Sequence, residues 1–447
     1  MKLRIFIIIL CLSLLPLAQS SAQEEKILRV YGKGAAGDWD NASFKKEMPG
    51  IAIDGSEDLG VPDAKDLITV LLTKEAYDLY AISIPWCNFD AISKKEYALD
   101  LAQDPAITSS VKKMYKFIQD AICIDNKILA VPIAIDCTQW GYEPKVWEMV
   151  QDKYDMDLPT DYLSLFQFFE WWIDEGQYDF PEIGLVRTDE DIKYVVTELL
   201  AKQILDIDCY KQEDFLTAEN EIAEIFQQLE KIDFSLLNKH IILEEGSDDY
   251  FLFDPFCEWT HLEEDQEEVN YLPLLLRLNE RDSFFIPVDI RVMFVNPATE
   301  MAEAATCYLS TFLAEEDDLS SILLYDTDHE PIMNQSIQDE INDLDSRIKQ
   351  LRAMDDDKAM QTVEELELQK ETLTKSIWKV TEEKIANYQQ ITSYFFPREY
   401  CPVYMSDSSD DDYFHNAILS FAQGKKSSAE FLSSLENIEN MMTKEGQ

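Results

Sequence analysis

The chain has 447 residues, of which 46% are hydrophobic, enough for about two or three folded domains, and this excludes wholesale disorder. Asp and Glu number 88 against 38 Lys and Arg, which gives a formal net charge of −50. A chain this acidic repels phosphate backbones and anionic membrane surfaces, so the composition argues against nucleic-acid binding.

Residues 1–22 are typical of a secretory signal peptide. Two basic residues precede an apolar stretch over 5–17, and Ser20 and Ala22 stand at the −3 and −1 positions of a cleavage site. The stretch is too short to span a bilayer. Cys11 lies inside the apolar stretch rather than after it, so we expect export without a lipid-attachment cysteine, to a secreted or periplasmic location.

Short apolar runs then alternate with helical patterns, which is typical of an α/β fold with a mainly parallel sheet. Strands are expected over 27–31, 78–82 and 128–132, and helices over 63–74 and 107–121. Residues 143–280 are expected to be mostly helical, with one helix beginning at Pro159–Asp161. A sheet segment over 284–297, a helix over 299–314 and a final helix over 414–441 complete the expected elements.

Residues 336–393 have a different pattern. Apolar residues recur at steps of three and four from Ile337 to Leu351, stop at 354–357, and resume from Val363. This spacing predicts an antiparallel helical hairpin, with ordinary core helices as the alternative.

Motifs of hydrolytic and metal-dependent enzymes are absent from the sequence. It contains neither G-x-S-x-G nor H-E-x-x-H, and its 4 histidines are far apart. The acidic run 407–412 lacks the glycine and the final Glu of an EF-hand loop. The cysteines after residue 22 form no C-x-x-C pair, so we expect mostly buried thiols and leave disulfides open. The sequence therefore predicts a protein that is not an enzyme and has no metal or cofactor.

Several stretches resemble, in order, the segments of one known family. Leu99–Pro105 resembles its Leu-Asp-Leu turn, Asp125–Pro132 its D-G-K-x-Y-A-V-P segment, and Leu158–Tyr162 its P-x-T-x-x-E helix start. Phe294–Thr299 resembles I-N-P-x-S, and Gly424–Leu432 resembles G-K-I-S-A-E-E-F-L. The chain thus resembles the extracellular solute-binding proteins of ABC importers, in the carbohydrate-type family 1 that is similar to maltose-binding protein.

The resemblance implies a two-lobed, periplasmic-binding-protein-like (type II) α/β fold with a hinge, plus the helical hairpin near the C-terminus. The expected parts are the signal peptide 1–22, lobe 1 over 23–138 and 287–330, a mostly helical lobe 2 over 139–286 and 394–447, and the hairpin over 336–393. The chain is expected to cross between the lobes near 132–142, 284–290 and 325–333.

A sugar site needs flat apolar faces for the C–H side of a pyranose, and carboxylates or amides for its hydroxyls. Loops at the carboxyl ends of strands are expected to supply them. The candidate ligand-binding residues are Asp38, Trp39, Trp86, Asp136, Trp140, Glu258 and Trp259, with Asp289 and Arg291 as second choices. Core packing is the alternative for each tryptophan, and the tryptophans assigned to core or helix surface are Trp147, Trp171, Trp172 and Trp378.

The resemblance therefore implies a monomeric receptor outside the cytoplasm that captures a saccharide between its lobes. It would deliver that small molecule to the permease subunits of an ABC transporter, its one link to the membrane. Two alternatives stay open: the same fold binding a peptide or a cationic solute, because an acidic cleft attracts cations, and a secreted interaction or sensing protein that uses the hairpin. A secreted glycoside hydrolase is disfavoured because no carboxylate pair stands out.

Overall fold

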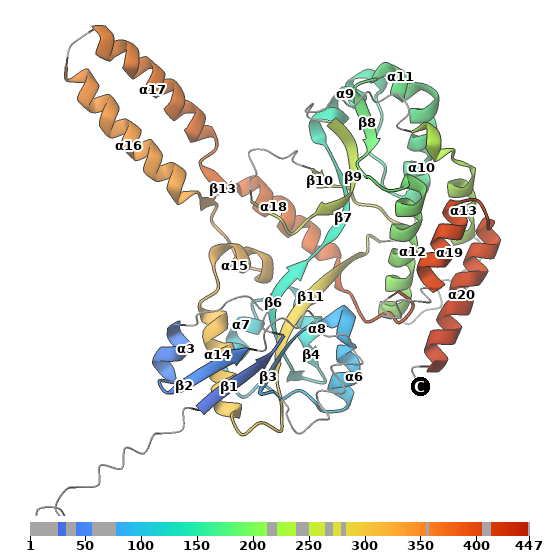
Figure 1. The fold of residues 1–447 in the computed structure, drawn as a ribbon, viewed down its shortest axis with the longest axis horizontal. Helices are drawn as coiled ribbons and strands as arrows, with labels where there is room; N and C mark the ends of the chain where they lie inside the picture. Colours follow the sequence, from blue (N-terminus) through green and yellow to red (C-terminus); the bar gives the residue numbers. More distant parts are fainter. Residues whose placement is uncertain are drawn as a thin grey trace, which may run out of the picture.

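The computed structural model shows two lobes, each built on its own sheet, and a helical hairpin that projects away from them (Figure 1). The described residues are 26–32, 42–55, 77–211, 221–237, 250–263, 271–278, 283–354, 357–404 and 413–445. The expected signal peptide, the helix expected over 63–74 and the acidic run lie outside them, as do Asp38 and Trp39. The expected α/β class with two lobes is confirmed.

Lobe 1 contains a six-stranded sheet with the order β14-β11-β3-β1-β2, in which β6 also pairs with β11. Its strands are β1 (Lys26–Tyr31), β2 (Ile51–Gly55), β3 (Leu79–Ser83), β6 (Val131–Asp136), β11 (Ile286–Val295) and β14 (Phe395–Pro397). β1 runs parallel to β2 and β3, whereas β11 runs antiparallel to β3 and β6. Every residue of β3 is buried, as is typical of a strand inside an α/β sheet. The strands expected over 27–31 and 78–82 and the sheet segment over 284–297 are confirmed.

The single helix expected over 107–121 is instead two short helices, α7 (Pro105–Val111) and α8 (Lys116–Ile122). Between them, the Tyr115 amide donates a hydrogen bond to the Leu324 carbonyl at 3.1 Å. The apolar spacing runs on without a break, but this long-range bond uses a donor that a continuous helix would need for itself.

Three described segments connect the lobes. β6 leads into β7 (Thr138–Tyr142) of the lobe 2 sheet, and β11 brings the chain back. The third segment is β14, which runs parallel to the beginning of β11. The crossings expected near 132–142 and 284–290 are confirmed by this arrangement.

The third crossing is later in the chain than the expected 325–333. After the hairpin, the chain returns to lobe 1 through β13 (Trp378–Val380) and α18 (Glu382–Ile391), and only then passes through β14. Tyr388 of α18 is 1% exposed and packs in the lobe 1 core. The hairpin expected over 336–393 therefore ends too late, because α18 repeats the apolar spacing of the hairpin helices.

Lobe 2 contains a four-stranded sheet with the order β10-β7-β9-β8. Its other strands are β8 (Ile183–Val186), β9 (Tyr250–Glu258) and β10 (Leu272–Pro273), and its longer helices are α9 (Pro144–Tyr154), α10 (Tyr162–Trp171), α12 (Ile192–Lys211), α13 (Glu221–Lys231), α19 (Tyr413–Ala422) and α20 (Ser428–Glu445). The segment expected to be mostly helical thus also supplies three strands. Pro255 interrupts the strand pattern of β9, and it is tolerated because β8 pairs with β9 only as far as Phe253.

Local signals place two helix ends in lobe 2. The Asp161 carboxylate accepts from the Ser164 amide in a capping box, so α10 begins where the sequence predicts. The final helix expected over 414–441 is divided into α19 and α20, because Gly424 adopts a left-handed φ of 67° just after α19.

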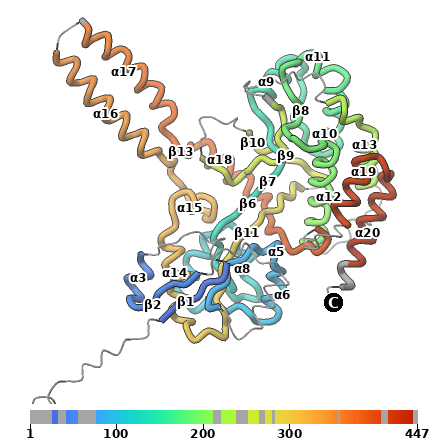
Figure 2. The backbone as a smooth tube through the Cα atoms, viewed as in Figure 1, coloured from blue at the N-terminus to red at the C-terminus, as the bar shows by residue number. Residues whose placement is uncertain are grey.

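The hairpin consists of α16 (Gln335–Arg352) and α17 (Asp357–Lys375), which run side by side away from the lobes (Figure 2). Its own small core contains Leu344, Ile348, Val363 and Leu366. At its base, β12 (Ile332–Met333) pairs antiparallel with β13. The antiparallel helical pair is therefore confirmed, with this shorter extent.

Each lobe has its own hydrophobic core. No disulfide joins the cysteines of the described residues, among which Cys87, Cys137 and Cys401 are buried. Within the same residues no group of His, Cys, Asp and Glu side chains could hold a metal ion. A helix long and apolar enough to cross a membrane is likewise not found there.

Candidate functional site

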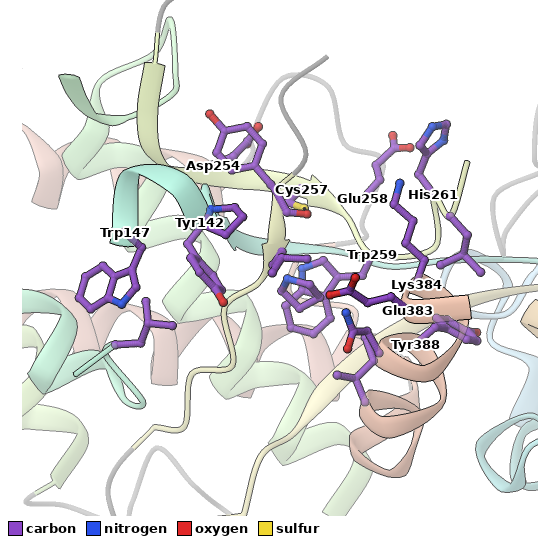
Figure 3. Close-up of a pocket in the computed structure, with 18 of the residues that line it drawn as sticks. Tyr142, Trp147, Asp254, Cys257, Glu258, Trp259, His261, Glu383, Lys384 and Tyr388 are labelled. Carbon is purple, nitrogen blue, oxygen red and sulfur yellow. The ribbon is translucent and has the colours of Figure 1, made fainter. Parts of the chain in front are cut away.

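A pocket with a volume of about 920 Å³ opens between the lobe 2 sheet and α18 (Figure 3). Residues of β7, β9, β10 and α9 form one wall, and α18 forms another. Because α18 packs on the lobe 1 core while β7 and β9 pack in lobe 2, the pocket lies between the two lobes. Its volume is within the range of about 300–1,000 Å³ that is usual for small-molecule sites.

β9 supplies the most exposed of the Phe, Tyr and Trp rings that line the pocket. Asp254, Phe256 and Glu258 are alternate residues of the strand, and all three line the pocket. Phe256 is 47% exposed, and its amide donates to the Asp254 carboxylate at 2.8 Å. Arg187, which follows β8, pairs with the same carboxylate at 3.3 Å. The exposed ring is thus flanked by an acid that its neighbours hold in place.

Further aromatic side chains form the deeper surface of the pocket. Trp147 and Trp259 are each 5% exposed, and Tyr142 and Tyr271 are half-buried. The Trp259 indole donates to the Trp140 carbonyl at 3.1 Å, which fixes the ring against β7. Burial raises the pKa of both tyrosines, and the Tyr271 hydroxyl donates to the Phe251 carbonyl at 3.3 Å.

The opposite wall presents polar groups from α18. Thr381 caps the helix by accepting from the Lys384 amide at 3.2 Å, and the Lys384 ammonium donates to the Glu263 carbonyl at 2.9 Å. Figure 3 shows Glu383 and Lys384 projecting from this helix. Asn387, one turn further along, adds an amide to the lining. A ligand here would meet a carboxylate, an ammonium and an amide.

Two of the predicted site residues line this pocket, namely Glu258 and Trp259. Trp140 does not: it is 1% exposed and packs in the lobe 2 core, so its role is core packing and the prediction of ligand contact is corrected. Along β7 its ring faces the lobe 2 helices, whereas Tyr142, two residues further on and half-buried, reaches the pocket.

The remaining predicted residues of the described chain lie elsewhere. Trp86, on the short helix α5 (Ile84–Cys87) of lobe 1, is 46% exposed but does not line the pocket. Asp136 pairs with Arg291 at 3.1 Å across β6 and β11, and neither lines the pocket. Contact between these residues and a ligand stays a prediction, as it does for Asp38 and Trp39.

Sequence reasoning missed Phe256, Arg187 and the whole α18 wall. The alternation of Asp254, Phe256 and Glu258 is the signal that could have found the first, once residues 250–258 are treated as a strand. The α18 wall had no such signal, because only the three-dimensional path of the chain brings that helix to lobe 2.

A second group of charged side chains lies where the crossing segments meet lobe 2. Arg398, which follows β14, contacts Asp289 of β11 at 2.6 Å and Asp206 of α12 at 3.2 Å. Tyr404 donates a hydrogen bond to the Asp206 carboxylate. Burial raises the pKa of Asp206 and Asp289, and the Arg398 guanidinium opposes that rise. Asp289, a second-choice ligand residue, is thus engaged in this hinge cluster.

Two α/β lobes, joined by crossing strands and separated by a pocket, define the two-lobed binding-protein class of folds. No protein-family model matches the chain, and no curated protein matches it in sequence. Similarity to solved structures, in contrast, extends over nearly the whole chain.

The cyclic alpha-maltosyl-1,6-maltose binding protein of Arthrobacter globiformis is 15% identical, with a TM-score of 0.53 over 93% of this chain and 98% of that one. A family 1 extracellular solute-binding protein of Bifidobacterium longum subsp. infantis is 10% identical, with a TM-score of 0.53 over 93% and 99%. An ABC substrate-binding protein of Listeria monocytogenes, in complex with cycloalternan, is 12% identical, with a TM-score of 0.50 over 94% and 100%. The chain has the fold of these solute-binding proteins.

Proposed function

We propose that the protein is an extracytoplasmic solute-binding protein that captures a sugar or an oligosaccharide between its lobes and delivers it to an ABC permease. The observation that carries the proposal is the interlobe pocket, which is lined by an exposed ring from β9 and by carboxylate and amide groups from α18. Two proteins of the same fold support it, because one is described as a maltosyl-maltose binding protein and the other is in complex with cycloalternan.

The pocket matches the two kinds of surface on a pyranose. Phe256 offers an apolar face to the C–H side of a sugar ring. Asp254 and Glu258 beside it, and Glu383 and Asn387 across the pocket, accept or donate hydrogen bonds to hydroxyls. Because the two walls belong to different lobes, a hinge motion would bring them together on a ligand.

We also propose that the protein is a monomer and that it binds its ligand without catalysing a reaction. The signal-like segment 1–22 supports export, and contact with the membrane would come only through the permease.

Titration with saccharides, followed by tryptophan fluorescence, tests the proposal directly, because Trp147 and Trp259 both line the pocket. Phe256→Ala is expected to weaken binding roughly tenfold or more, because the exposed ring loses its stacking surface. Tyr413→Ala is the matched control: its ring, on α19, is 47% exposed like that of Phe256, but lies outside the pocket.

The control should bind like the wild type. A large loss of affinity in Trp86→Ala with none in Phe256→Ala would mean that the ligand binds at the lobe 1 residues predicted from the sequence. No binding by any saccharide would overturn the proposed function.

A cationic solute is the second candidate, because carboxylates outnumber cations in the pocket lining. The acids are Glu148, Asp254, Glu258, Glu263 and Glu383, against Arg187 and Lys384. Salt separates the two candidates: affinity for a polyamine should fall steeply as ionic strength rises, whereas affinity for a neutral saccharide should not.

A further inference from the structure

A second hollow, with a volume of about 480 Å³, lies at the base of the hairpin. It is lined by Pro331, Trp378, Thr381, Glu382, Glu383 and Ala386. Thr381 and Glu383 also line the interlobe pocket, so the two hollows adjoin at the first turn of α18. A ligand that leaves the interlobe pocket along this turn would enter the second hollow.

Trp378 is the aromatic surface of this second hollow. It is 39% exposed, although the sequence assigns it to the core or a helix surface. Its backbone pairs with Met333 across β12 and β13, and the Asn334 amide donates to the Ile377 carbonyl at 2.8 Å. The ring is therefore presented on a paired strand rather than on a free loop.

The neighbouring side chains complete the chemistry that a sugar unit needs. Glu382 and Glu383 stand in the first turn of α18, next to the Trp378 ring along the same hollow. A flat apolar face beside carboxylate acceptors repeats the combination found around Phe256 in the interlobe pocket.

We propose that the base of the hairpin is an outer subsite for the far end of a linear oligosaccharide whose first units occupy the interlobe pocket. Trp378 stacks on an outer sugar unit, and Glu382 and Glu383 accept hydrogen bonds from its hydroxyls. The inference rests on the proposed function and deepens it: the cargo is a saccharide of several units, and the hairpin base selects for its length.

The test measures dissociation constants for a series of linear oligosaccharides, from a disaccharide to a heptasaccharide, by calorimetry on the full-length protein. Trp378→Ala is expected to weaken binding of the long members roughly tenfold and to leave the disaccharide unchanged. Trp378→Tyr should recover most of the loss, because it keeps an aromatic face.

Met333→Ala is the control for the β12–β13 ribbon, because Met333 is the strand partner of Trp378, is 40% exposed and lines neither hollow. It should bind every member like the wild type. An equal loss at all lengths in Trp378→Ala, or no loss at any length, would overturn the subsite while leaving the proposed function intact. Absence of binding by the wild type at every length would overturn both.

Discussion

The hinge cluster around Arg398 and the hairpin both contain contacts between arginine and carboxylates, but those of the hinge cluster are far less exposed to water. The side chain of Arg398 is 19% exposed and that of its partner Asp206 is 2% exposed. In the hairpin, Arg352 and Glu367 are 57% and 45% exposed. Water screens the hairpin pair and reduces its contribution to stability. In the hinge cluster, loss of the arginine leaves a carboxylate that little water can reach and that has lost its counter-ion. An arginine–carboxylate contact is therefore expected to contribute more to stability in the hinge cluster than in the hairpin.

The largest effect is expected from Arg398→Met. The substitution leaves the buried Asp206 and the half-buried Asp289 without their cation, and we expect the free energy of unfolding to fall by about 3–5 kcal/mol. Urea denaturation of the two proteins measures the difference. A loss below about 1 kcal/mol would show that water reaches the cluster, and the contrast between hinge and hairpin would fail.

The hairpin is expected to depend on its small core instead. Leu344 is 1% exposed, and Leu344→Ala should cost about 3 kcal/mol, within the range for buried leucines. Amide hydrogen exchange should accelerate in α16 and α17 and stay unchanged in the two lobes. Leu368→Ala, in the same hairpin at 67% exposure, is the matched control and should change exchange little. Acceleration that spreads through lobe 1 would mean that the hairpin is part of that lobe's cooperative unit.

A buried acid without a cation provides a second comparison with the acids of the hinge cluster. Burial raises the pKa of Glu316, between α14 (Ala302–Ala314) and α15 (Asp318–Leu324), to about 7, and no ion pair among the described residues includes it. The folded state then binds a proton more tightly than the unfolded state. Stability is therefore fully present below the unfolded pKa and is lost as the pH rises through 7, by roughly 3 kcal/mol.

Denaturation at a series of pH values from 4 to 8 measures this loss, and Glu316→Gln supplies the reference, because it cannot ionise. The difference in unfolding free energy between wild type and variant should grow with pH. A constant difference would show that folding does not raise the pKa of Glu316.

The smallest effect is expected from Arg352→Ala. Its partner Glu367 stays in water, so the free energy of unfolding of the hairpin should fall by about 0–1 kcal/mol. Hydrogen exchange in α16 at low and high salt measures it, and high salt should abolish what difference there is. A loss as large as that of Leu344→Ala would mean that surface pairs, rather than apolar packing, hold the hairpin together.

Sequence alone predicts best where a single local pattern decides the structure. The start of α10 follows from the Asp161 cap, and the β3 strand follows from an uninterrupted apolar run. The break between α7 and α8 was not predictable, because its cause is a bond from Tyr115 to a carbonyl more than two hundred residues away. Apolar residues at steps of three and four likewise cannot distinguish α18 from the hairpin helices that precede it.

The candidate site shows the same limit. Glu258 and Trp259, chosen at the end of a strand, line the pocket, whereas Trp140, also predicted to contact the ligand, packs in the lobe 2 core. Which side of β7 faces the core depends on the neighbouring helices, and no local pattern records that. Phe256 was missed because Pro255 hides the strand, and proline is usually a sign that a strand has ended.

The pairing of β12 with β13 makes the hairpin a separable module. The chain leaves lobe 1 at Ile332 and re-enters it opposite, at Val380, so the ends of the whole excursion are adjacent backbone partners. Closing so short a gap costs little chain entropy whatever lies between. A short turn could replace α16 and α17 without moving lobe 1, and an insertion of another length could take their place. The lobes would then keep their shape while the length of the projecting segment changes independently of the lobe cores.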